Sequence, residues 1–146
     1  MSITTSPSTG ATATAAHSLI DARLVKIEDV ARDTKLYTFA RIEGGALPAY
    51  KPGAHIDLHL PNGLVRQFSL VVPNNDPASY VVGVKKDAAS RGGSRFIHES
   101  VRAGDILRIG PPRNNFALTE DAAYSVLIAG GIGITPIWCI DRKSVV

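Results

Sequence analysis

The pentapeptide that begins at Arg66, Arg-Gln-Phe-Ser-Leu, combines a cation, an aromatic ring and a hydroxyl in one short run. On a strand, Arg66 and Phe68 share one face, whereas Gln67 and Ser69 share the other. A guanidinium can pair with a phosphate, an aromatic ring can stack on a planar ligand, and a hydroxyl can donate to a ring nitrogen. The run therefore predicts a site for a planar, phosphorylated ligand. The alternative is an ordinary strand, with the ring in the core and the cation in solvent.

A second candidate element is Arg-Gly-Gly-Ser-Arg-Phe at 91–96. Gly92 and Gly93 permit close approach of a ligand to the backbone, and the free N–H groups of a following helix favour an anion. The spacing of apolar residues predicts that helix within 94–104, with Ser94 as its N-cap and Gly104 just past its end. A plain loop before a capped helix is the alternative.

Two further glycine-containing segments are candidate ligand contacts. Gly83, inside a predicted strand, indicates close approach of a ligand or of another backbone, while Lys85 and Lys86 also fit as solvated charges. The segment 129–136, Ala-Gly-Gly-Ile-Gly-Ile-Thr-Pro, is a glycine-rich turn between a predicted strand and a predicted helix, which is the context of a nucleotide-binding turn. Thr135 is placed there to contact a cofactor or to cap the helix, and Pro136 suits the first helical turn.

The elements that position these residues are mostly short β-type runs. Six of them, separated by turn signals, occur at 19–31, 35–42, 55–60, 64–72, 80–86 and 105–109. They predict an all-β antiparallel barrel or sandwich. The continuous apolar run 123–131 instead predicts a strand buried on both faces in a parallel sheet. We therefore expect a disordered tail at 1–17, a barrel domain at 18–120 and the start of a second domain at 121–146.

Composition excludes several classes of protein. The formal charge of +3 is small and scattered, which argues against nucleic-acid binding, and there is no apolar run long enough to span a membrane. Cys139 is the single cysteine, so the chain carries no internal disulfide and no cysteine-ligated iron–sulfur cluster; we expect it to be a small buried hydrophobe. His55 and His59 lie too far apart on one strand for a metal, and no metal site is predicted. Without a secretory signal, the default location is cytoplasmic.

Five segments, taken in their order along the chain, resemble the ferredoxin-NADP reductase superfamily. They are RQFSL, GVKK, RGGSRFIHESVRAGD, GPPRNNFAL and LIAGGIGITPI. Within it they are most similar to the phthalate dioxygenase reductase and vanillate demethylase reductase group, over roughly residues 19–140. The resemblance implies a six-stranded antiparallel Greek-key barrel of the flavin-binding FR type with one capping helix. The first strand, turn and helix of a truncated α/β nucleotide-binding domain would follow.

The resemblance also implies residue roles. Arg66 would hold the flavin phosphate, Phe68 would lie against the isoalloxazine ring, and Ser69 would hydrogen-bond near N5. The set implied to bind flavin is Arg66, Gln67, Phe68, Ser69, Gly83, Val84, Lys85, Gly92, Gly93, Ser94 and Thr135. The set implied to begin the NAD(P) site is Gly130, Gly131, Gly133, Thr135 and Pro136. Phe68 replaces the commoner tyrosine, at a loss of roughly 1 kcal/mol for one hydroxyl hydrogen bond.

The function implied by the resemblance is that of an NAD(P)H-dependent flavin oxidoreductase, the reductase component of an aromatic-ring oxygenase or demethylase system. It would pass a hydride from NAD(P)H to FMN, with FAD as the alternative, and electrons onward to an oxygenase component or iron–sulfur acceptor. No side chain would act as acid or base. A complete nucleotide-binding domain needs on the order of 100 further residues, so a truncated chain is expected. A flavin-binding module without turnover and a cofactor-free interaction barrel are the alternatives.

Overall fold

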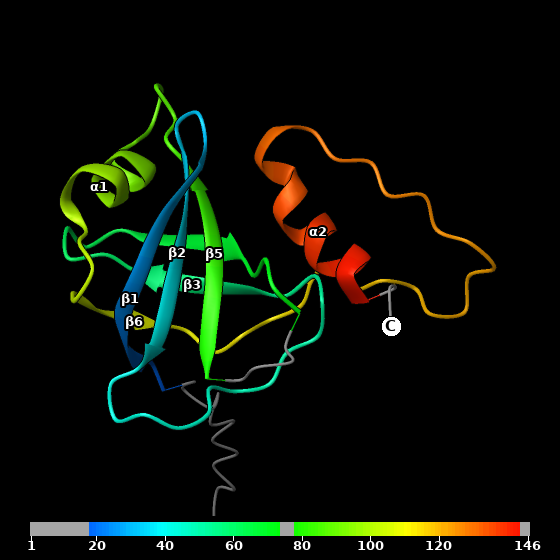
Figure 1. Ribbon diagram of the computed structural model, residues 1–146, viewed down its shortest axis with the longest axis horizontal. Helices are drawn as coiled ribbons and strands as arrows, with labels where there is room; N and C mark the ends of the chain where they lie inside the picture. The colour runs from blue at the N-terminus through cyan, green and yellow to red at the C-terminus, as the bar shows by residue number, and fades with distance from the viewer. Residues whose placement is uncertain (1–17, 74–77, 144–146) are drawn as a thin grey trace, which may run out of the picture.

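The computed structural model describes residues 18–73 and 78–143, so the predicted tail at 1–17 lies outside the described residues. Six strands form one antiparallel sheet in the order β4-β3-β6-β1-β2-β5. A bridge between Leu70 and Val82 joins the two outer strands and closes the sheet into the predicted barrel (Figure 1). The strands are β1 (Ile20–Ala31), β2 (Thr34–Arg41), β3 (His55–His59), β4 (Val65–Ser69), β5 (Ser79–Lys85) and β6 (Ile106–Ile109).

The barrel is filled by alternate residues of its strands. Phe39, Ile56 and Ile109 are fully buried, and they come from three different strands. Because successive side chains of a strand point to opposite faces, the alternation read from the sequence places one apolar face of each strand in the core. Phe68 of β4 is partly buried and packs against this cluster, so its ring lies at the edge of the core.

The predicted helix is present as α1 (Gly93–Ser100), but Ser94 is not its N-cap. The N-cap is Gly92, which has a φ of 92° and makes no side-chain capping hydrogen bond. A glycine adopts this left-handed conformation without strain, so the helix begins one residue before the serine. The Ser94 hydroxyl instead accepts a hydrogen bond from the backbone N–H of Asp87 at 3.1 Å. The helix also ends earlier than predicted, at Ser100 with Val101 as its C-cap, so Gly104, with a φ of 99°, lies in the following turn and not just past the helix end.

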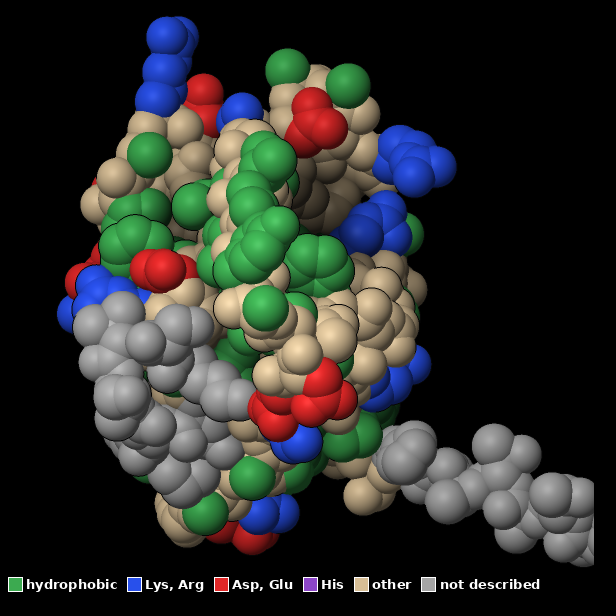
Figure 2. All heavy atoms as spheres, turned by 90° about the vertical axis from the view of Figure 1, so that its right-hand side faces the viewer, with side chains coloured by type: hydrophobic (Ala, Val, Ile, Leu, Met, Phe, Trp, Pro, Cys, Tyr) green, Lys and Arg blue, Asp and Glu red, His purple; other side chains and the backbone are tan. Residues whose placement is uncertain are grey.

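The part of the chain after β6 differs from its prediction in one element. The turn and helix are present as η1 (Gly131–Gly133) and α2 (Ile134–Lys143), but 123–131 is not a strand. Tyr124 and Ile128 are 83% and 84% exposed. A strand needs a neighbour for its backbone groups, and no described strand pairs with this segment. It runs as an extended loop (Figure 1), and hydrophobic side chains gather on that side of the molecule (Figure 2).

Helix α2 has two buried residues in its second half, Cys139 and Ile140, and Thr135 near its start lies against Gly83 of β5. The prediction that Cys139 is a buried small hydrophobe is confirmed, and burial raises the pKa of its thiol. Trp138 stays 44% exposed, with the guanidinium carbon of Arg142 4.7 Å from its ring centroid. Among the described helices, none has the length and apolar character needed to cross a bilayer.

Candidate functional site

A cavity of about 750 Å³ opens between β4, the end of β5 and the start of α1. Five of the predicted flavin-site residues line it, and they come from all three elements. These five are Arg66, Gln67, Phe68, Lys85 and Ser94. The remaining wall is Asp33, Lys86, Asp87, Ala88, Ala89, Ser90, Arg91 and Ile132. The first and second sequence motifs therefore meet at one hollow, as a shared ligand site requires.

Arg66 lies directly against the first turn of α1. A Cβ built on Gly93 would be 2.6 Å from Nε and 2.9 Å from Cγ of Arg66, so a larger residue at this position would displace the arginine side chain. Arg66 Nη1 also donates to the carbonyl oxygen of Val65 at 2.9 Å. A guanidinium is thus held beside a helix N-terminus, where free N–H groups and the positive end of the helix dipole also favour an anion.

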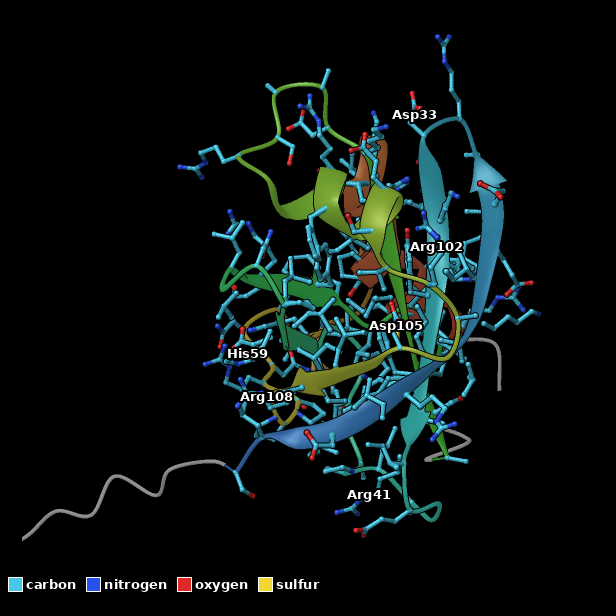
Figure 3. All side chains as sticks on the ribbon, turned by 90° about the vertical axis from the view of Figure 1, so that its left-hand side faces the viewer. Asp33, Arg41, His59, Arg102, Asp105 and Arg108 are labelled. Atoms are coloured by element: carbon cyan, nitrogen blue, oxygen red, sulfur yellow. The ribbon has the colours of Figure 1, made fainter. Side chains whose placement is uncertain are left out.

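The loop from Lys85 to Arg91 forms the rim of this cavity and is fixed on both sides. Towards the helix, the guanidinium of Arg95 donates to the carbonyl oxygen of Ala88 at 3.2 Å. Towards the β1–β2 hairpin, the N–H of Lys86 donates to the carbonyl oxygen of Asp33 at 2.6 Å. Asp33, labelled in Figure 3 at the tip of that hairpin, has a φ of 54°. The rim is therefore built from three separate segments of the chain.

The charge of the cavity wall is positive. Four cationic side chains, Arg66, Lys85, Lys86 and Arg91, line it with the two carboxylates of Asp33 and Asp87. Lys86 also forms an ion pair with Glu99 at 2.8 Å. The hydrogen bond from Lys86 lowers the pKa of the Glu99 carboxyl. A wall with this excess of cations attracts an anionic ligand group.

A second cavity of about 300 Å³ adjoins the first on the side of α2. The two cavities share Gln67, Phe68, Lys85 and Ile132 as common walls. The predicted residues Ser69, Gly83, Gly133, Thr135 and Pro136 line only the second cavity. Phe68 therefore lies between two adjoining hollows, one lined by Arg66 and the other by Ser69.

Gly83 is a point of close approach, as its place within a strand predicted. The neighbour is a side chain of this chain: a Cβ on Gly83 would be 2.7 Å from Cγ2 of Thr135. The Thr135 hydroxyl donates to the carbonyl oxygen of Ile132 at 3.0 Å, and only 9% of the residue is exposed. The start of α2 is thus seated on β5 at the position where a side chain is missing.

Other predicted residues lie outside both cavity walls. Val84 is buried, and its carbonyl oxygen accepts from Nε2 of His98 at 2.8 Å. Gly92 lies beside Leu64, while side chains built at Gly130 or Gly131 would meet no atom within 4 Å. The described residues hold no cluster of three or more His, Cys, Asp or Glu suited to a metal ion.

Sequence reasoning missed the contribution of Asp33 and of the loop residues from Asp87 to Arg91. Asp33 stands between two predicted strands in Ala-Arg-Asp-Thr, so a hairpin turn there was readable from the sequence. That this hairpin reaches the rim follows from strand pairing, since Thr34 lies opposite Lys85 in the β2–β5 register. No local signal shows such a pairing.

No protein-family model matches the chain. Among curated proteins, it is 51% identical over 126 residues to the tetrachlorobenzoquinone reductase of Sphingobium chlorophenolicum, covering 86% of this chain and 39% of that protein. It is 49% identical over 125 residues to a vanillate O-demethylase oxidoreductase of Pseudomonas putida, again covering 86% and 39%. The chain therefore spans about two fifths of the length of these relatives.

Among solved structures, the chain matches phthalate dioxygenase reductase with a TM-score of 0.82 and 34% sequence identity. The match covers 85% of this chain and 39% of that one. That protein is described as a modular structure for electron transfer from pyridine nucleotides to a 2Fe–2S centre. Most of this chain thus shares its fold with part of that protein.

Proposed function

Because the chain is homologous to vanillate demethylase and phthalate dioxygenase reductases and has the ferredoxin reductase-like fold, we propose that it binds a flavin. It would act as the flavin unit of an NAD(P)H-dependent reductase. The observation that carries the proposal is the contact of Arg66 with Gly93, which places a guanidinium beside the start of α1 in one cavity. An isolated arginine on a strand would favour no particular ligand, whereas this pairing suits a phosphate.

The residues present fit a flavin mononucleotide. The larger cavity holds about 750 Å³, its wall is cationic, and the helix start carries glycine where a Cβ would occupy the place of the guanidinium. Arg66 with Gly92, Gly93 and Ser94 would hold the phosphate. Phe68 would lie along the ring system, and Ser69 would donate to a ring nitrogen from the adjoining cavity.

The chemistry belongs to the cofactor and its orientation to the protein. When bound, a flavin accepts a hydride from a nicotinamide and passes electrons onward. The barrel would contribute a fixed wall, a phosphate anchor and exclusion of water from one ring face. Gly133, Thr135 and Pro136 line the adjoining cavity and would begin the nicotinamide side, with Gly130 and Gly131 preceding them. No side chain in either wall is required to act as acid or base.

We infer FMN in preference to FAD, because the connection from β5 to α1 is short. The electron acceptor would be an oxygenase component or an iron–sulfur centre, by analogy with phthalate dioxygenase reductase, which transfers electrons to a 2Fe–2S centre. The division into a barrel domain at 18–120 and a nucleotide-binding part at 121–146 belongs to the same proposal.

Flavin titration of the purified protein tests this proposal. Quenching of flavin fluorescence should show saturable binding of FMN, and FAD should bind more weakly. Arg66→Ala should weaken FMN binding by about 10- to 100-fold, since a hydrogen bond to a charged group is worth roughly 1.5–3 kcal/mol. Arg66→Lys should lie between, because it keeps the charge and loses the planar fork. Equal affinity of all three proteins would refute the phosphate contact.

Addition of NADH under anaerobic conditions distinguishes a working reductase from a flavin-binding module without turnover. Bleaching of bound FMN identifies a reductase with a working nicotinamide site. Retained colour identifies a flavin-binding module without turnover of its own. A protein that binds neither FMN nor FAD would leave only the cofactor-free interaction barrel.

A further inference from the structure

His98 is a side chain near the site whose role neither motif nor cavity lining indicates. It lies on the last turn of α1, and its Nε2 is 2.8 Å from the carbonyl oxygen of Val84 on β5. A carbonyl oxygen only accepts, so Nε2 carries the proton and donates. The imidazole also makes an edge contact with the ring of Tyr37, with centroids 6.1 Å apart. Its orientation is thus fixed from two sides.

The hydrogen bond from His98 reaches β5 at the stretch that forms part of both cavity walls. Val84 stands between Gly83, which lines the smaller cavity, and Lys85, which lines both. At the other end of the same eight-residue helix, Gly93 contacts Arg66. One short, rigid element therefore contacts the predicted phosphate anchor with its first turn and the β5 wall with its last. The separation of the two walls depends on where α1 sits against β5.

Other contacts also tie α1 to this stretch, but they are more exposed. The ion pair between Lys86 and Glu99 leaves 36% and 52% of the two side chains accessible, and solvent weakens such pairs. The Ser94 hydroxyl, which accepts from the N–H of Asp87, holds the loop rather than the strand. The His98 bond is partly buried and reaches the strand itself, so it fixes the relative position of helix and wall most directly.

We propose that His98 is a positioning residue for flavin binding: it holds α1 and the Val84 carbonyl in register so that the two cavity walls fit one ligand. This inference rests on the proposed flavin function. His98 touches neither cavity, so it acts through the strand and not on the cofactor.

The test compares FMN affinity and the visible circular dichroism of bound FMN across variants at His98. His98→Ala should bind FMN about five- to tenfold more weakly, the loss expected for one hydrogen bond. His98→Gln, whose amide nitrogen reaches about as far as Nε2, should return to within about twofold of the parent protein. His98→Asn is one carbon shorter and should behave like His98→Ala. Ser100→Ala, an exposed change on the same helix, is the matched control and should bind as the parent does.

Each result decides the matter. Failure of the parent protein to bind FMN refutes the proposed function, whereas parent binding with an unaltered His98→Ala refutes only the positioning role. Equal weakening in His98→Ala and His98→Gln also overturns it, since the hydrogen bond would then not be the cause. If His98→Ala does not fold, the difference between His98→Gln and His98→Asn gives the answer: a weaker Asn variant supports the role, and equal affinities refute it.

Discussion

The two halves of the candidate site are held by very different amounts of structure. The cavity walls on β4, β5 and α1 belong to a barrel whose main buried cluster lies entirely between Ala22 and Ile109. In the part after β6, the buried side chains among residues 111–142 are Thr135, Cys139 and Ile140. The proposed phosphate side of the site thus belongs to the packed barrel, whereas the proposed nicotinamide side depends on a few contacts of α2. Flavin retention and hydride delivery should be separable by mutation.

The two regions also differ in charge. The stretch 122–140 contains no Asp, Glu, Lys, Arg or His, and several of its apolar side chains are exposed. The cavity wall on the barrel, in contrast, carries four cations. Buried apolar area stabilises the barrel, while exposed apolar area in 122–140 contributes little to folding until something covers it. The free energy of unfolding should therefore respond strongly to substitutions of buried residues in the barrel and hardly at all to substitutions of exposed residues in 122–140.

The largest contrast is expected between two isoleucines. Ile56 is fully buried on β3, so Ile56→Ala should lower the free energy of unfolding by about 2–5 kcal/mol. Ile128 is 84% exposed, and Ile128→Ala should change it by less than about 0.5 kcal/mol. Urea denaturation followed by circular dichroism measures both. Similar losses for the two variants would mean that the segment around Ile128 is packed in solution.

Alkaline pH should destabilise the barrel through its buried tyrosines. Burial raises the pKa of Tyr37 and of Tyr80 from 10.0 to about 12, and raises that of Tyr50 as well. Between pH 10 and 12 the unfolded chain loses these protons and the folded chain keeps them. The stabilisation is complete below pH 10 and falls as pH rises, by about 1.4 kcal/mol per pH unit for each tyrosine.

Urea denaturation at several pH values between 8 and 12 tests this dependence. Tyr80→Phe is the informative variant: it removes the hydroxyl that donates to the carbonyl oxygen of Pro48, so it should be less stable at neutral pH. Its stability should then fall less steeply above pH 10 than that of the parent protein. Identical slopes would argue against Tyr80 as a source of the alkaline loss.

A smaller effect, confined to ligand binding, is expected at Gly93. Gly93→Ala places a methyl 2.6 Å from Nε of Arg66, and the flexible arginine must move away. We expect FMN binding to weaken about tenfold, which is about 1.4 kcal/mol, while folding stability is unchanged or slightly higher because alanine favours a helix. Gly104→Ala, at a glycine in the turn after the same helix, is the comparison: strain at its φ of 99° should lower stability and leave affinity intact. Unchanged FMN affinity in Gly93→Ala together with weaker binding in Gly104→Ala would contradict the proposed phosphate site.

Much of the barrel was predictable because its signals are local. The alternation in His55–His59 and the turn at 61–63 define two neighbouring strands without reference to any other part of the chain. The meeting of Arg66 with Gly93 was predictable only through the family resemblance, since the two residues are separated by strand β5 and a loop. The sequence pattern alone left each motif with an ordinary structural explanation.

Two predictions failed for identifiable physical reasons. Serine is favoured at an N-cap, which predicts Ser94 there, but the left-handed conformation available to Gly92 starts the helix earlier. The run 123–131 has the composition of a buried parallel strand, but a strand forms only beside a partner, and no described strand supplies one. The composition of a segment indicates which surroundings it is suited to. Whether those surroundings exist depends on the rest of the fold.

The smallest effect, and the most selective, is expected where the two regions touch. Gly83→Ala places a methyl 2.7 Å from Cγ2 of Thr135, so the start of α2 must shift while the barrel stays folded. We expect the free energy of unfolding to change by less than about 1 kcal/mol, because the part after β6 buries few side chains. Trp138, the single tryptophan, lies on α2 and reports the shift through its emission maximum and its quenching by acrylamide.

Thr135→Ser supplies the control, since serine keeps the hydroxyl that donates to Ile132 and lacks the methyl that collides. The double variant Gly83→Ala/Thr135→Ser should therefore restore the tryptophan signal of the parent protein, and the coupling between the two sites should be clearly non-additive. The rate at which NADH reduces bound FMN under anaerobic conditions should follow the tryptophan signal. Additive changes in Trp138 emission would show that α2 does not pack against Gly83. The proposed difference between a firmly packed barrel and a weakly packed α2 would then be wrong.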